Sequence, residues 1–163
     1  MRSPYRRPEP EVDTRRVNGS YVIVGLVGFT FLFGMAFWWF QTNAFYEETW
    51  ADEVLIAGTV YPVTKWKGLT STSSPLKMRA CFVISEPFEA PPSIAPEPLV
   101  APGWFKCFNA EYIEESLASK YGKAYVAEHN DPEGFDRIVA VFPGGKGYMW
   151  RQLSESIAQQ IER

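Results

Sequence analysis

The chain has 163 residues, of which 46% are hydrophobic and 16% aromatic, and its formal net charge is −3. Residues 1–20 hold five arginines and three acidic residues, so the chain after residue 40 carries a net charge of −5. That sign argues against a nucleic-acid-binding protein, which needs a basic face. The chain after residue 40 has the length of one ordinary domain, and two further domains would not fit.

Residues 1–20 are rich in Arg, Pro and acidic side chains and have no apolar periodicity. We interpret them as a disordered cytoplasmic tail. Their preferred role is to set the topology of the chain. Attraction to anionic lipid is the alternative, which the interleaved acidic residues weaken.

Residues 21–40 contain no charge, no proline and no amide side chain. A helix of this length spans about 30 Å, the thickness of a bilayer's hydrocarbon core, so we predict a transmembrane helix. Five arginines precede the run, whereas residues 41–60 contain four acidic residues and no Lys or Arg. The positive-inside rule then places the N-terminus in the cytoplasm and residues 41–163 outside.

Two alternatives to an uncleaved anchor fit this run less well. A cleaved signal peptide has an apolar region of roughly 7–15 residues, shorter than this one, and residues 42–44 match a cleavage site poorly. A twin-arginine export signal at residues 14–17 is less favoured, because the run is too apolar. Small residues along the run could contact a partner helix, and two of them form a small-xxx-small pair; the candidates are Gly25, Gly28, Thr30 and Gly34.

Residues 41–57 form a juxtamembrane segment whose aromatic and aliphatic residues recur near helical spacing, so we predict a possible helical extension that ends at Gly58. A short or edge strand follows around Pro62. Residues 76–84 alternate cleanly and predict a strand. Residues 85–103 hold six prolines, which favours a rigid connector wrapped on its own domain over a ligand for a partner.

The remaining elements complete the domain over residues 58–163. A helix is expected over residues 110–120, capped by Asn109 and ended by Gly122. Strands are expected over residues 123–129, 135–142 and 147–153, with a hairpin loop at 143–146, and a short helix over 155–163. The fold class is therefore a single N-terminal transmembrane helix plus a small α+β domain with a mostly antiparallel sheet.

Cys81 and Cys107 are the two cysteines of the chain. If residues 41–163 lie on the oxidising side of the membrane, a disulfide is favoured over two buried thiols. It would close a loop of about 27 residues and stabilise the domain by roughly 3–4 kcal/mol. The two are too far apart in sequence for a redox C-x-x-C motif.

Catalytic motifs are weak in this sequence. His129 has acidic neighbours but lacks the further nitrogen or thiolate ligands of a zinc site, so a solvated side chain is the preferred interpretation. No G-x-S-x-G motif surrounds Ser71, Ser73 or Ser74, and residues 144–147 do not form a P-loop. We predict no catalytic residue, no cofactor and no metal.

Four large side chains are possible partner contacts because Arg and Trp dominate binding hot spots. They are Arg79, Trp104, Arg137 and Trp150. Stacking of Arg on Trp across a sheet face is the structural alternative.

Three segments carry a resemblance to a known family: SSPLKMRACF (73–82), APGWFKCF (101–108) and FDRIVAVFPGGKGYMW (135–150). The chain resembles an uncharacterised alphaproteobacterial family of single-pass membrane proteins, a domain of unknown function, over the span and nearly all that follows. The resemblance supports the cysteine pair and implies a bacterial inner membrane, which makes the outside the periplasm. Some members are labelled histidine kinases, but this chain has neither an ATP-binding domain nor a dimerisation helix with a phospho-acceptor histidine.

The function favoured by these observations is a non-catalytic accessory or assembly subunit of a larger membrane protein complex. The alternative is a periplasmic ligand-binding or sensing module with a pocket lined by Arg79 or Arg137. An enzyme would require a hidden site built from scattered Ser, Asp and His129.

Overall fold

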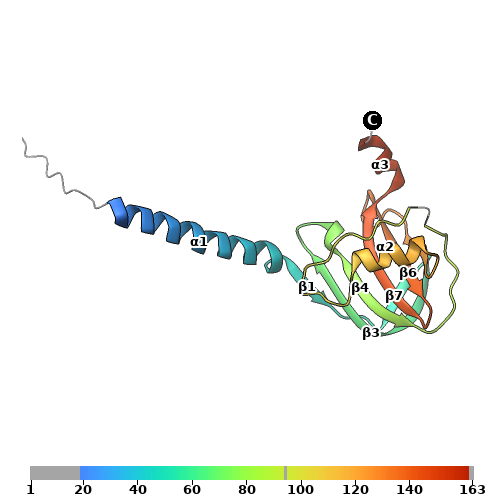
Figure 1. Ribbon diagram of the computed structural model, residues 1–163. Coiled ribbons are helices and arrows are strands. Elements are labelled where there is room, and N and C mark those ends of the chain that lie inside the picture. The colour runs from blue at the N-terminus through green and yellow to red at the C-terminus, as the bar shows by residue number, and fades with distance from the viewer. Residues whose placement is uncertain (1–18, 94, 162–163) are drawn as a thin grey trace, which may run out of the picture. The chain divides into compact units, whose positions relative to one another are not determined.

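The computed structural model describes residues 19–93 and 95–161 (Figure 1). The predicted disordered tail lies outside the described residues, except for residues 19 and 20, which are helical. The chain divides into two compact units, residues 1–40 and 41–163. Each unit is described by itself.

The first helix, α1 (Gly19–Asn43), contains the whole apolar run and continues past both of its ends. None of its 25 residues is buried by the rest of the chain. The rings of Phe29, Phe33 and Phe37 stack along one side, with centroids 5.7 and 6.1 Å apart. The helix is long and apolar enough to cross a membrane, although a signal sequence near an N-terminus passes the same test.

The second unit is built on one seven-stranded sheet in which every pairing is antiparallel. The strand order is β1-β3-β4-β7-β6-β5, and β2 pairs with the first part of β3. The strands are β1 (Tyr46–Thr49), β2 (Glu53–Ile56), β3 (Thr59–Ser71), β4 (Arg79–Ile84), β5 (Lys123–Glu128), β6 (Phe135–Phe142) and β7 (Lys146–Leu153). A 3₁₀ turn η1 (Pro75–Lys77), α2 (Ala110–Ala118) and α3 (Glu155–Ile161) complete the unit.

The sheet curls so that its two ends meet. The amide of Ala57, just after β2, donates to the carbonyl of Ala127 on β5 at 2.7 Å. A core of aliphatic and aromatic side chains from β2 to β7 fills the inside of the curl, with Ile56, Val139 and Met149 fully buried.

A second core covers the outer face of the sheet. There α2 lies across the strands in Figure 1, and its Ile113 packs with Ile138 and Trp150. Because the sheet is covered on both faces, alternate residues of β4 and β6 enter different cores, and most residues of both strands are buried. The predicted fold class is confirmed: one apolar N-terminal helix and a small α+β domain with an antiparallel sheet.

The predicted helical extension over residues 41–57 is wrong beyond Asn43. The segment forms β1 and β2 instead, each paired with β3, and belongs to the compact unit. Hydrogen bonding to β3 overrides the local helical spacing, since Val54 and Ile56 alternate into the inner core.

Three other boundaries differ from the prediction. The strand expected from residue 76 starts at Arg79, because Pro75 opens the η1 turn. The strand around Pro62 is longer than expected; Pro62 lies where β2 alone pairs with β3, so the ladder tolerates its missing N–H. The helix over 110–120 ends at Ala118, and Lys120 rather than Gly122 has a positive φ of 61°.

The proline-rich segment wraps on its own domain, which is the arrangement that its sequence favours. The amide of Ser93 donates to the Ala124 carbonyl at 3.0 Å, and the amide of Val126 donates to the Pro91 carbonyl at 2.8 Å. Further along, the Gln152 side chain donates to the Ala95 carbonyl at 2.9 Å. Residues 91–93 therefore lie along the outer edge of β5.

Candidate functional site

The disulfide joins the middle of the sheet to the segment before α2. Cys81 on β4 and Cys107 are bonded, with their Cα atoms 6.2 Å apart, which confirms the predicted pair. Phe105 and Phe108, on either side of Cys107, are buried in the outer core, and the Phe108 ring meets Trp150 edge-on at 6.2 Å. The bond therefore holds the aromatic loop that leads into α2 against the sheet.

Arg79 is buried at the start of β4, with 3% of its surface exposed. Its guanidinium donates to three backbone carbonyls: Leu99 at 2.8 Å, and Leu76 and Met78 at 2.6 Å each. It also lies 5.6 Å from the centre of the Phe108 ring. Burial lowers the pKa of Arg79 to about 10, against a smaller raising effect of Tyr46. Arg79 thus fastens the proline-rich segment to the η1 turn.

Trp150 lies directly opposite Arg79 in the β4–β7 ladder and is completely buried. Its indole nitrogen donates to the Gln152 side-chain oxygen at 3.2 Å. The prediction that Arg79 and Trp150 contact a partner is wrong, because the sheet is covered on both faces and neither side chain reaches the surface.

Arg137 belongs to an ionic cluster between β5, β6 and the turn that joins them. It pairs with Glu128 opposite it on β5, and its Nε lies 3.4 Å from an Asp131 carboxylate oxygen. Arg151, its neighbour across the β6–β7 ladder, lies 3.3 Å from the same oxygen. Two guanidinium groups and two carboxylates therefore balance one another, and a role of Arg137 as a partner contact stays a prediction.

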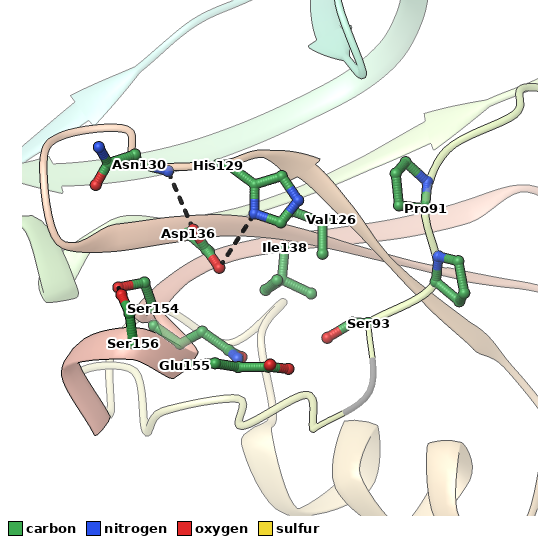
Figure 2. A pocket seen from close by; sticks show the side chains of 12 residues that line it. Pro91, Ser93, Val126, His129, Asn130, Asp136, Ile138, Ser154, Glu155 and Ser156 are labelled. Atoms are coloured by element: carbon green, nitrogen blue, oxygen red, sulfur yellow. Dashed lines mark hydrogen bonds and ion pairs between the residues drawn. The ribbon is translucent and has the colours of Figure 1, made fainter. Parts of the chain in front are cut away.

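A pocket of about 510 Å³ lies where β5, the proline-rich segment and α3 meet (Figure 2). We name it the His129 pocket. It is lined by Pro91, Pro92, Ser93, Val126, His129, Asn130, Asp136, Ile138, Gln152, Ser154, Glu155 and Ser156. Both apolar and polar side chains line it, so its lining suits a small ligand with several hydrogen-bonding groups.

The polar groups of the His129 pocket bond mainly to one another. His129 Nδ1 lies 3.4 Å from one carboxylate oxygen of Asp136, and the other accepts from the Asn130 amide at 3.0 Å. In Figure 2 the second ring nitrogen of His129 points away from Ser154 and Ser156. The aspartate and histidine thus adopt part of a catalytic arrangement in which neither of these serines is placed as the nucleophile. Within the described ranges, no three His, Cys, Asp or Glu side chains gather as metal ligands.

The serines considered from the sequence lie elsewhere, around the turn between β3 and η1. Ser71 and Ser73 share a hydrogen bond of 2.9 Å between their hydroxyls, and Lys77 donates to Ser73 at 2.9 Å. The structure does not bring His129 to this turn.

An open groove of about 430 Å³ lies between β1, β3 and the disulfide loop, and we name it the Trp104 groove. Its lining combines aromatic and charged residues: Glu48, Thr49, Trp50, Lys67, Gly68, Trp104, Phe105, Lys106 and Cys107. Trp50 is 81% exposed and Trp104 is 38% exposed. The Trp104 indole donates to the Thr42 carbonyl at 2.9 Å, and its ring meets Tyr46 edge-on at 5.9 Å. Of the four large side chains predicted as partner contacts, Trp104 is thus the most exposed.

The four small residues predicted to contact another helix all lie in α1. Successive residues advance by about 100° around a helix, so Gly34 lies about 180° from Gly25. Gly25 and Gly28 are one turn apart on one side, and Thr30 and Gly34 are one turn apart on roughly the other. Within the described residues, no heavy atom beyond the nearby helix backbone lies within 4 Å of the position that a Cβ would take at any of the three glycines.

Comparison with protein families gives one result. The model of a family of unknown function, DUF6446, matches residues 56–162. This chain belongs to the DUF6446 family. A search of the curated proteins and a search of the solved structures each returned no match.

The DUF6446 match runs from the last residue of β2 to the end of the described chain and beyond it by one residue. It includes both cysteines, Arg79, Trp104 and the whole His129 pocket. It does not include α1 or β1, whereas the resemblance was expected to extend over the apolar run. The Trp104 groove is lined partly by residues within the DUF6446 match and partly by three residues that precede it, Glu48, Thr49 and Trp50.

Sequence reasoning missed both hollows of this DUF6446 protein. The His129 pocket assembles residues that are more than sixty positions apart, and no spacing rule joins them. The Trp104 groove has one signal in the sequence, the aromatic residues directly after the apolar run, but their spacing predicts a helical extension instead.

Proposed function

We propose that this protein is a non-catalytic accessory or assembly subunit of a larger membrane protein complex, held in the bilayer by α1 as an uncleaved single span. The membrane helix, the folded domain and the family of unknown function are compatible with this role. Three polar side chains of the domain serve the fold: Arg79 bonds backbone carbonyls, Arg137 bonds carboxylates, and Gln152 holds the proline-rich segment.

The observation that carries the proposal is α1 itself. A helix that serves only as an anchor gains nothing from glycine, which costs about 1 kcal/mol per position relative to alanine in helix propensity. Close packing against another membrane helix compensates this cost, because small residues let two backbones approach. Among the residues that the structure describes, none buries Gly25, Gly28, Thr30 or Gly34, so these small residues are open to a partner helix.

The proposed location is the bacterial inner membrane, with the N-terminus in the cytoplasm and the domain in the periplasm. Five arginines before α1 and none in residues 41–60 support this orientation. The disulfide supports an oxidising compartment for the domain. The alphaproteobacterial resemblance supports a bacterial membrane with a periplasmic side.

Mild solubilisation of cross-linked cells tests the proposal, with the full chain tagged at its C-terminus. We expect the tagged chain to be recovered in a complex of defined size and composition. Gly34→Leu and Gly25→Leu block opposite sides of α1, and we expect one of them to abolish recovery of the complex. Val27→Leu is the matched control, since it changes an already large residue. Recovery of the wild-type chain as a free monomer would contradict the proposal.

A second candidate function, binding of a small ligand by a sensing domain, is favoured by the His129 pocket. Arg79 and Arg137 are not the lining that was expected, because both are engaged inside the domain. A ligand that raises the unfolding temperature of the full chain, but not that of an Asp136→Asn variant, would support this candidate. The same ligand raising both temperatures equally would refute the assignment to this pocket.

A further inference from the structure

The Trp104 groove lies beside the point where the chain leaves the apolar run. Trp104 is bonded to the carbonyl of Thr42, which is two residues after Phe40, the last residue of the run. Two residues of chain reach about 7 Å at most. If α1 spans the bilayer as proposed, the Trp104 indole is therefore within reach of the membrane–water boundary.

The aromatic residues of the groove are of the kind that favours this boundary. An indole combines a large apolar ring with one N–H donor, and tryptophan is enriched where a membrane helix meets water. Trp50 leaves 81% of its surface uncovered by the domain. So large an apolar side chain is costly to leave in water but gains stability among lipid headgroups.

The groove is also basic on an otherwise acidic domain. Lys67 and Lys106 line it with one acidic residue, Glu48, whereas residues 41–163 carry a net charge of −5. In the part of the chain that the structure describes, neither lysine forms an ion pair with a carboxylate. Both ammonium groups are therefore available to an anion that enters the groove.

We propose that the Trp104 groove binds the headgroup of an anionic phospholipid. Lys67 and Lys106 contact the phosphate, and the rings of Trp50 and Trp104 lie beside the glycerol and ester region. The volume of about 430 Å³ is in the range of small-molecule sites and holds a headgroup, while the acyl chains remain in the bilayer. The bound lipid would fix the domain at the membrane surface. This inference rests on the span proposed above, but not on any protein partner.

The experiment uses the purified full chain reconstituted into phosphatidylcholine vesicles that contain a minor fraction of phosphatidylglycerol. After re-extraction in mild detergent, native mass spectrometry counts the lipids of each class that stay bound. We expect phosphatidylglycerol to be enriched over its share of the vesicle. In the double variant Lys67→Glu, Lys106→Glu this enrichment should fall by at least about twenty-fivefold, because each basic residue near an anionic surface contributes about a factor of five.

The matched control is Lys120→Glu, Lys123→Glu, which makes the same charge change at lysines that line a different pocket. It should keep the enrichment, and Trp50→Phe and Trp104→Phe together should reduce it. Equal retention of the two lipids by the wild type, or equal loss in the groove variant and the control, would overturn the proposal. So would a groove variant that keeps its lipid in the vesicles but is no longer recovered in the complex from cross-linked cells, since the groove would then be a protein-docking site. No partner protein is present in the vesicles, so failure of the subunit role leaves this result unaffected.

Discussion

Removal of the disulfide should destabilise the domain by a calculable amount. The bond closes a loop of 27 residues, since the two cysteines are 26 positions apart. In the chain-entropy model, a loop of this length contributes about 3.5 kcal/mol at 25 °C. We therefore expect Cys81→Ala, Cys107→Ala to lower the free energy of unfolding by about 3–4 kcal/mol. For residues 41–163 this corresponds to a fall in Tm of roughly 12–16 °C.

Urea denaturation of the full chain in detergent, followed by near-ultraviolet circular dichroism of the domain, measures this difference. Dithiothreitol should lower the midpoint of the wild type to that of the double variant and leave the variant unchanged. A single Cys107→Ala variant is the control, because it removes the bond but keeps the buried Cys81 side chain. A double variant that loses less than about 1 kcal/mol would refute the loop-entropy reasoning.

Three further predictions concern local features. Burial raises the pKa of Tyr148, so the folded protein holds its phenol proton more tightly than the unfolded chain, and the free energy of unfolding should fall as the pH rises above 10. Urea titrations at several pH values should show a smaller fall for Tyr148→Phe. Gly144 and Gly145 both have positive φ, but a Cβ on Gly145 would collide with the Ile84 carbonyl. Gly144→Ala should therefore lower the free energy of unfolding by about 1 kcal/mol and Gly145→Ala by clearly more, and equal thermal shifts would contradict this steric argument. Asn109→Ala removes the cap that accepts from the third residue of α2 at 3.1 Å and should cost about 1 kcal/mol by the same assay, whereas Asn109→Asp should cost little.

The elements that the sequence predicts well are those with strong local signals. The β6–β7 hairpin combines two alternating segments with a Pro-Gly-Gly turn, and the structure places both strands within one residue of the expected limits. The cap of α2 follows from Asn109 alone. The disulfide follows from an even cysteine count in a segment expected outside the membrane.

The features that failed depend on long-range pairing. Residues 46–56 have helical spacing locally, and only β3, which follows them in sequence, turns them into strands. Arg79 alternates with apolar neighbours like a surface residue, but α2 and the proline-rich segment cover that face of the sheet. The Trp104 groove and the His129 pocket likewise exist only after the sheet has curled, so residue spacing cannot reveal them.

The covering of β5 by residues 91–93 has a consequence for how neighbouring molecules behave. Proteins anchored in one membrane share a plane, so their domains meet far more often than the same number of molecules in solution. A bare sheet edge would then recruit the next copy by strand pairing. Pro91 and Pro92 have no N–H to offer, and Ser93 has already used its own. On its β5 side the sheet therefore ends at a segment that cannot extend it. If α1 anchors the chain in a membrane as proposed, this keeps neighbouring copies from pairing at that edge.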